Sequence, residues 1–246
     1  MVSVATTASA WSPVVLAAGI GVSMFESDAI EVPNDAVITE VSRKASPDTV
    51  DRLFGDTSAP GVIAIGVSEG TMRADGSKNK AYDGHTDPGN GAHNKGFGSC
   101  QVAACQGKSI EEVDAYLLNR TANVAKGLIE RNPDWEEEWI IAGTDLEIQA
   151  PLAVPGFERK LNKLKEAGKP IGEEELVKAR VQGFYNPSTG KLEAGGFNND
   201  LQRLENDQRR RIQGQAEVLE KVRNLEKSYA GNKCNIIVGV CWIPGT

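Results

Sequence analysis

Three acidic residues in or beside a glycine-rich stretch are the candidates for chemistry: Glu69, Asp83 and Asp87. Glu69 closes a segment that begins with the apolar run 62–67. If that run is a buried helix, lost hydration and the negative end of the helix dipole raise the pKa of the glutamate. A carboxyl that stays protonated near neutral pH can protonate a departing glycosidic oxygen. The alternative is an ordinary solvent-facing glutamate just past a core helix.

A second carboxylate would stabilise an oxocarbenium-like transition state or position a water molecule. Asp83 and Asp87 lie in a stretch that can fold back over Glu69. The segment Asp87-Pro88-Gly89-Asn90-Gly91 is equally typical of a simple turn. The sequence therefore leaves open which aspartate is the partner.

The elements that must position these residues are expected to be mostly helices. The run 62–67 suits a buried strand or a buried helix, and we favour a helix because Glu69 follows it. Residues 70–107 are irregular and glycine-rich, as in a functional lobe with short strands. The charge run of the last expected helix is typical of a solvated face, and four aromatic residues are expected in the core: Tyr116, Trp135, Trp139 and Phe157. Helices are expected after Ser46-Pro47, from the Ser109 capping box to about 130, from Pro133 through Leu146, from Pro155 through Leu164, from Glu173 to Phe184 and from Asp200 to Tyr229.

Glu69, the later segment Gly-x-x-Asp-Pro-Gly-Asn-Gly (84–91) and Gly-x-Gly-x-x-Gln (96–101) together resemble the active-site lobe of the lysozyme superfamily. The likeness covers residues 59–107 and is closest to goose-type lysozymes and soluble lytic transglycosylases. The Ala-Tyr-x-Gly pattern at 81–84 also resembles phage-type lysozymes. The resemblance implies that Glu69 is the catalytic acid and that Asp87, or Asp83, is the second carboxylate. It implies that the glycan groove is lined by Tyr82, His85, Asn90 and Gln101.

The expected fold is mainly α (α+β): a lysozyme-like helical domain with a small Gly-rich β/loop lobe. The expected divisions are an N-terminal arm with a short helix (1–58), the lysozyme-like domain (59–230) and a C-terminal β tail (231–246). Residues 1–25 carry no charge, as in an arm that packs on a neighbour, an unordered end or a weak signal peptide. A secretory signal peptide would need a positive residue ahead of its apolar core, and this segment has none. We therefore favour delivery as part of a virion or injection apparatus.

The resemblance implies a muramidase or lytic transglycosylase that cuts the β-1,4 link of peptidoglycan in the cell wall or periplasm. Its partners would be peptidoglycan glycan strands. If a phage delivers the enzyme, proteins of the phage tail or injection machine would also be partners. The alternative is a structural component of such an apparatus that carries a lysozyme-like domain, possessing or lacking activity. If only Glu69 is essential, the anhydro-forming transglycosylase route, in which a hydroxyl of the substrate is the nucleophile, is favoured.

Composition excludes several other classes. A net charge of −7 argues against nucleic acid as the main partner, and no apolar run reaches the ~18–20 residues of a membrane span. No cofactor or metal is expected, because His85, His93, Cys100 and Cys105 lack zinc-finger spacing and the loop from Asp75 lacks calcium ligands. The cysteines are expected to be free thiols packed as small hydrophobes, with a Cys234–Cys241 bridge as the alternative.

Overall fold

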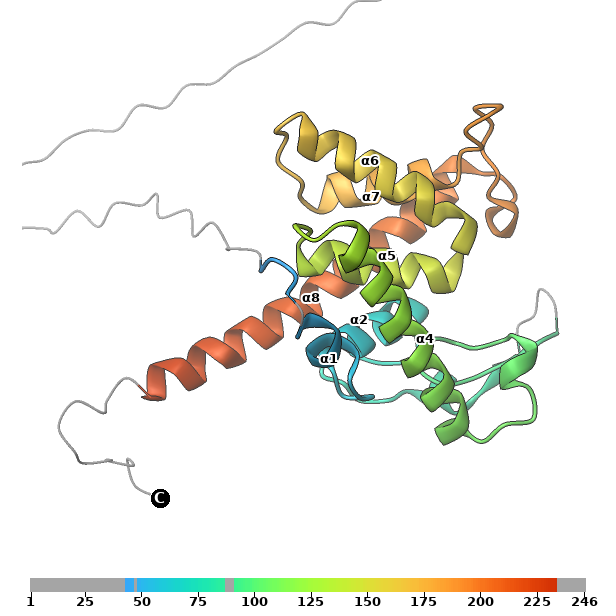
Figure 1. Cartoon of the computed structure of the whole chain (residues 1–246). Coiled ribbons are helices and arrows are strands. Elements are labelled where there is room, and N and C mark those ends of the chain that lie inside the picture. The colour runs from blue at the N-terminus through green and yellow to red at the C-terminus, as the bar shows by residue number, and fades with distance from the viewer. Residues whose placement is uncertain (1–42, 47, 87–90, 234–246) are drawn as a thin grey trace, which may run out of the picture. The chain divides into compact units, whose positions relative to one another are not determined.

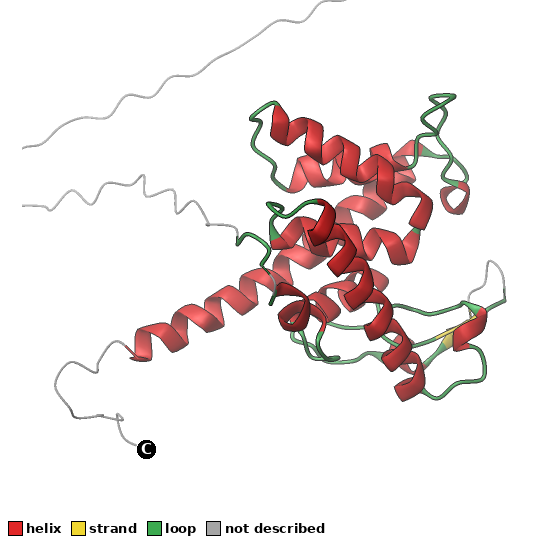
Figure 2. Cartoon of the chain, viewed as in Figure 1, coloured by secondary structure: helices red, strands yellow, loops and turns green. Residues whose placement is uncertain are grey.

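The computed structural model describes residues 43–46, 48–86 and 91–233 (Figure 1), which all belong to one compact unit beginning at Val41. The expected start of a β tail at residue 231 is wrong, because residues 231–233 are helical. The expectations for the N-terminal arm, for Asp87 and Asn90, and for the rest of the tail with Cys234 and Cys241 concern residues outside these ranges. The described chain is mainly helical with one small antiparallel sheet, as expected for a mainly α protein (Figure 2). No helix among these residues is long and apolar enough to cross a membrane.

The helices lie close to the places that the sequence predicts. The α-helices are α1 (Thr49–Phe54), α2 (Pro60–Glu69), α3 (Lys80–Asp83), α4 (Ile110–Arg131), α5 (Glu137–Gln149), α6 (Val154–Glu166), α7 (Glu173–Gly183) and α8 (Leu201–Lys233). Three short 3-10 helices are η1 (Ala103–Cys105), η2 (Pro151–Ala153) and η3 (Gly195–Phe197). The strands are β1 (His85–Thr86) and β2 (His93–Asn94), which pair antiparallel with His85 opposite Asn94.

Local chemistry explains where the helices begin. Ser109 and Glu112 form the predicted capping box at the start of α4, each side chain accepting from the other's backbone N–H. The predicted start of α5 at Pro133 is wrong, because the backbone at 135–137 pairs with residues 43–45. Ala45 N–H donates to the Trp135 carbonyl and Glu137 N–H to the Arg43 carbonyl, which keeps Glu136 extended until the helix begins.

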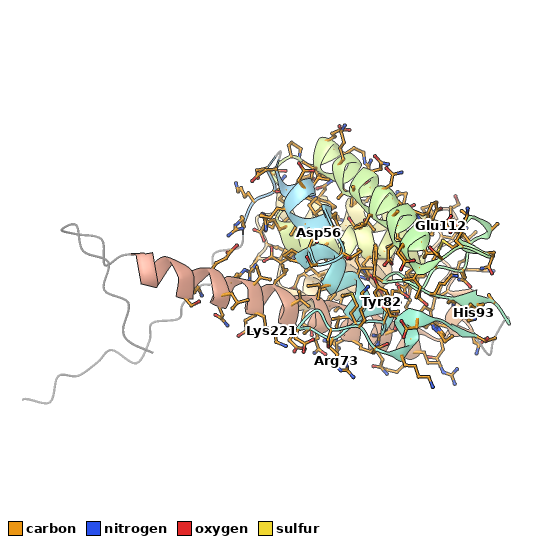
Figure 3. The ribbon with its side chains drawn as sticks, turned by 90° about the horizontal axis from the view of Figure 1, so that it is seen from below. Asp56, Arg73, Tyr82, His93, Glu112 and Lys221 are labelled. Atoms are coloured by element: carbon orange, nitrogen blue, oxygen red, sulfur yellow. A yellow bond between two sulfur atoms is a disulfide. The ribbon has the colours of Figure 1, made fainter. Side chains whose placement is uncertain are left out.

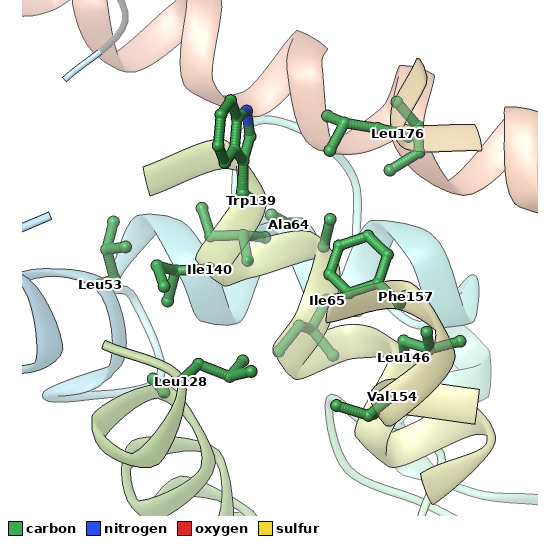
Figure 4. Close-up of a cluster of buried hydrophobic side chains, with 14 of the residues drawn as sticks. Leu53, Ala64, Ile65, Leu128, Trp139, Ile140, Leu146, Val154, Phe157 and Leu176 are labelled. Carbon is green, nitrogen blue, oxygen red and sulfur yellow. The ribbon is translucent and has the colours of Figure 1, made fainter. Parts of the chain in front are cut away.

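The hydrophobic core surrounds α2, which is apolar on every side except at its C-terminal end. Ile65 of α2 lies among side chains from α4, α5 and α6, including Leu128, Ile140 and Phe157 (Figure 4), and all four are fully buried. Leu53 and Phe54 of α1 are buried in the same core, so the segment before residue 59 contributes to it. Trp135, Trp139 and Phe157 are core residues as expected, whereas Tyr116 is 37% exposed, contrary to the expectation.

The long helix α8 runs beside α2 and also contacts α5 and α7 (Figure 1). Gly214 makes the close approach possible, because a Cβ there would lie 2.7 Å from Cγ1 of Val67. The expectation of a solvated charge run is wrong for one side of this helix, where Gln208, Arg211 and Gln215 are buried. These polar side chains find partners on α2 and α5, which makes their burial tolerable.

The lobe between α2 and α4 contains the short sheet and a disulfide between Cys100 and Cys105. The expectation of free thiols is therefore wrong for this pair. The bond closes a short loop that contains η1, which ends at Cys105. This loop is the last part of the lobe before α4 begins.

Candidate functional site

Glu69 is the last residue of α2, and its side chain is only 14% exposed. The helix ends there because Gly70 adopts a left-handed conformation (φ 72°), from which its N–H bonds back to the Gly66 and Val67 carbonyls. Residues with a side chain rarely take that conformation, so the glycine fixes the point at which the chain leaves the helix. Glu69 thus lies partly buried at the C-terminal end of an apolar helix, as the sequence predicts.

Arg211 of α8 holds the Glu69 carboxylate. Its Nη1 lies 2.7 Å from Oε1 of Glu69 and 3.1 Å from Oδ1 of Asp145, and its Nε donates to Oδ2 of Asp207 at 2.9 Å. One guanidinium therefore serves three carboxylates from α2, α5 and α8. Such multiply bonded arginines fix geometry, because the planar fork cannot rotate without losing several contacts.

A second buried cation completes the network beneath Glu69. Arg180 of α7 and Asp145 of α5 are both fully buried, and Nη2 of Arg180 lies 2.8 Å from Oδ2 of Asp145. Gln215 donates to Asp145 at 3.1 Å and to the Ser68 hydroxyl at 2.9 Å. Asp145 is therefore saturated by two arginines and an amide, and it has no surface on which a substrate could bind.

The surroundings raise the pKa of Glu69. Burial disfavours its charged form most strongly, and although Arg211 opposes this, the neighbouring carboxylate of Asp145 acts in the same direction as burial. Burial lowers the pKa of Arg211, but Asp145, Glu69 and Asp207 outweigh it and hold that pKa above its ordinary value. Arg211 is therefore charged in every relevant state, and Glu69 is the titrating member of the pair.

Glu69 faces a cavity of about 180 Å³ between the lobe and the helices. Gln101, one of the expected glycan-binding residues, lies on the wall of the same cavity. Among the described residues Glu69 is the one carboxylate in that wall. The lining consists of Glu69, Gly98, Ser99, Cys100, Gln101, Val102, Leu117, Arg120, Ile148, Gln149 and Arg211.

The other expected site residues do not meet Glu69 in this cavity. Tyr82, labelled in Figure 3, was expected to line the groove, and this is wrong. Its ring is fully buried and its hydroxyl donates to Oδ2 of Asp114 at 2.5 Å. Asp83, at the end of α3, is exposed and is not in the cavity lining, so it is not the partner carboxylate in this arrangement. His85 is half-buried, with Nδ1 3.3 Å from the Ala81 carbonyl, and it too lies outside the lining. Asp87 and Asn90 are outside the described residues.

Metal binding finds no support in these side chains. Cys100 and Cys105 are bonded to each other, so their sulfurs are not zinc ligands. Asp75 accepts the Ser77 N–H at 2.9 Å, which makes it part of a turn. Within the described ranges, no group of three or more histidine, cysteine, aspartate or glutamate side chains is placed to hold an ion.

Asp145, Arg180 and Arg211 are the site residues that sequence reasoning missed. A signal for two of them exists in the sequence: Asp145 lies inside an otherwise apolar stretch of α5, and Arg180 follows Leu176 and Val177 by one helical turn. A charge on the apolar face of a helix predicts a buried ion pair, since an isolated charge there would be prohibitively unstable. The partner of such a charge cannot be found without the fold. No protein-family model, curated protein or solved structure matches the chain.

Proposed function

We propose that this protein is a peptidoglycan-cleaving enzyme with a lysozyme-like domain, and that it acts as a lytic transglycosylase with Glu69 as general acid. The observation that carries the proposal is the setting of Glu69: a carboxyl of raised pKa and 14% exposure, at a helix end, facing a cavity beside a glycine-rich lobe. A general acid needs this combination of partial dryness and access.

The transglycosylase route is favoured over hydrolysis because Glu69 is the one carboxylate that the described part of the chain places in the cavity wall. Hydrolysis uses a second carboxyl ~5–5.5 Å away for retention or ~6.5–9.5 Å away for inversion. The buried carboxylate nearest in the network, Asp145, is fully enclosed by Arg180, Arg211 and Gln215 and cannot reach a sugar. A mechanism that needs one titrating group fits this wall best.

In the proposed reaction, the protonated Glu69 donates its proton to the glycosidic oxygen, which takes the electron pair of the breaking C1–O bond. The C6 hydroxyl of the same sugar then bonds to C1 and closes an anhydro ring. Its proton passes to the Glu69 carboxylate, which restores the acid without consuming water. Arg211 acts as a positioning residue, because its bonds to Asp145 and Asp207 keep its Nη1 beside Glu69 throughout.

The cavity itself is smaller than the ~300–1,000 Å³ of typical ligand pockets. We therefore propose that the cavity holds only the atoms of the glycosidic linkage that is cut. The rest of the glycan strand would lie on the protein surface outside the cavity. Gln101 is an amide in its wall that can hydrogen-bond sugar hydroxyls, whereas the Gln149 amide is engaged by Arg180, Gln208 and Asp207.

Clearing of a cell-wall suspension, followed by mass spectrometry of the soluble products, tests the proposal. Wild type should release anhydro-sugars, lighter by one water than hydrolysis products, and Glu69→Gln should lower the rate by roughly 10²–10⁴-fold. Asp83→Asn is the matched control and should retain the wild-type rate. Full activity in Glu69→Gln would overturn the proposal, and hydrated products would assign hydrolysis in place of transglycosylation.

The C-terminal part of α8 favours an assembly role as the second candidate. All side chains from 224 to 228 are exposed, including Leu225 at 59%, and this part of the helix extends away from the other helices (Figure 1). An exposed stretch of helix such as 224–228 is suited to a partner surface in a tail or injection apparatus. Co-sedimentation with phage particles, by a protein that leaves cell walls intact, would select this candidate.

A further inference from the structure

Three basic side chains of α6 line one side of a second cavity and have no acidic partners among the described residues. Arg159, Lys160 and Lys163 line a space of about 450 Å³ together with Gln182 and Tyr185, and no carboxylate belongs to its wall. Among the described residues none of the three cations forms an ion pair, whereas their α6 neighbour Lys165 pairs with Asp134. In a chain of net charge −7, three unneutralised cations around one cavity form a local positive site.

A larger cavity shares wall residues with both the basic cavity and the Glu69 cavity. It has a volume of about 590 Å³, shares Arg159 and Tyr185 with the basic cavity, and shares Gln149 with the cavity of Glu69. Gln149 is firmly held, because its Oε1 accepts from Arg180 and Gln208 while its Nε2 donates to Asp207. The intermediate cavity thus has Gln149 in common with the candidate acid's cavity and Arg159 in common with the basic one, and its own wall includes one carboxylate, Glu193.

We infer that the basic cavity binds the carboxylates of the peptide stem carried by a peptidoglycan strand whose linkage lies at Glu69. The inference rests on the proposed function. The three cations sit at positions i, i+1 and i+4 of one helix, so Lys163 is a surface neighbour of both Arg159 and Lys160 and the three form one concentrated positive patch. A concentrated positive patch attracts a peptide with more than one carboxylate, and a stem peptide has two, the free α-carboxyl of its γ-linked D-Glu and its C-terminal carboxyl. The Gln182 amide beside the cations can hydrogen-bond peptide groups of the same stem.

Binding is measured on the whole chain carrying Glu69→Gln, so that no turnover is needed. The probe is the fluorescently labelled pentapeptide L-Ala–γ-D-Glu–L-Lys–D-Ala–D-Ala, and fluorescence anisotropy gives its Kd. The triple variant Arg159→Ser, Lys160→Ser, Lys163→Ser should weaken binding by about tenfold or more, and added salt should weaken it in the parent. The control triple variant Arg203→Ser, Lys221→Ser, Lys227→Ser removes the same charge from exposed sites outside the three cavities and should leave the Kd unchanged.

Two further probes decide the source of the anion. The same pentapeptide with its carboxyls amidated should bind no better to the parent than to the Arg159, Lys160, Lys163 variant. Poly(glycerol phosphate) is the second probe. If it binds the parent and not the Arg159, Lys160, Lys163 variant, while the peptide binds neither, the inference is overturned in favour of a phosphate polymer. Equal peptide binding by the parent and the triple variant would also overturn it. Because the readout is binding, loss of activity in Glu69→Gln and loss of peptide affinity are separate results that test separate statements.

Discussion

Nη1 of Arg211 lies 2.7 Å from Oε1 of Glu69, although the two residues are 142 positions apart in the chain. The same nitrogen lies 3.1 Å from Oδ1 of the fully buried Asp145. The candidate acid is thus attached to a charge network inside the protein, and the cavity wall is only its outermost part. Substitutions in that network should affect both stability and the titration of Glu69.

Arg211→Met should lower the free energy of unfolding by about 3–5 kcal/mol, because it leaves Asp145 with one arginine and Glu69 with none. Urea denaturation followed by circular dichroism measures the change. Arg209→Met, two positions earlier on α8, breaks an exposed pair with Glu174 and should cause almost no loss. Equal losses in the two variants would show that the buried network does not stabilise the fold.

The pH dependence of stability should differ between wild type and Glu69→Gln. The folded protein raises the pKa of Glu69 above its ordinary 4.5, so folding favours the protonated form. That contribution is fully present below pH 4.5 and is lost as the pH rises through the folded pKa. The stability of wild type relative to Glu69→Gln should therefore fall from acidic toward neutral pH in urea titrations. A relative stability that instead falls on acidification would mean that Arg211 outweighs burial and lowers the pKa.

Tyr82→Phe should lower the free energy of unfolding by about 1–3 kcal/mol, because Oδ2 of the buried Asp114 loses its donor. Because this side chain lies inside the lobe, the KM for cell-wall substrate should stay at the wild-type value. Thermal denaturation and initial rates measure the two effects. Tyr116→Phe, at a residue that is 37% exposed, is the control and should be silent in both. An unchanged stability with a raised KM would return Tyr82 to the glycan surface.

Gly183→Ala should destabilise the protein by roughly 1–3 kcal/mol. Gly183 ends α7 against the start of α6, where an added Cβ would lie 2.4 Å from the Ala153 carbonyl oxygen, a backbone atom that cannot easily move away. Differential scanning calorimetry measures the shift. Gly196→Ala places its Cβ in open space and should be neutral, so a similar loss in both variants would exclude the close contact as the cause.

Reducing agent should lower the thermal stability of wild type, because the Cys100–Cys105 bond limits the unfolded chain, by about 2 kcal/mol for a loop of this length. Calorimetry with and without dithiothreitol measures this change. The double variant Cys100→Ser, Cys105→Ser should show no response to the reagent. A response equal to that of wild type would place the redox-sensitive bond elsewhere in the chain.

Most of the helical architecture follows from local signals. Capping at Ser109, the prolines at the starts of α2 and α6, and the apolar spacing of α8 each act within a few residues of the element they define. The start of α5 escaped prediction because residues 43–45, far away in sequence, hold the backbone at 135–137 extended. Tertiary pairing of this kind overrides a local signal such as Pro133.

The site was predictable where it depends on a single helix end. The position of Glu69 follows from the apolar run before it and Gly70 after it, whereas the role of Tyr82 was misjudged because its partner, Asp114, belongs to another helix. Likewise, the sequence does not distinguish Arg211 from the neighbouring surface cations of α8. Its burial follows only from the packing of α8 against α2. Residues whose setting depends on two or more distant segments are the ones that sequence patterns cannot resolve.

The position of α8 along the chain has a consequence for biosynthesis. Segments α2 and α5 leave the ribosome well before residue 211 is made, and until then the carboxyls of Glu69 and Asp145 lack the guanidinium that joins them. The cavity wall is complete only once α8 has been made and Arg211 has joined it. A nascent or prematurely terminated polypeptide that lacks α8 therefore lacks the finished cavity wall.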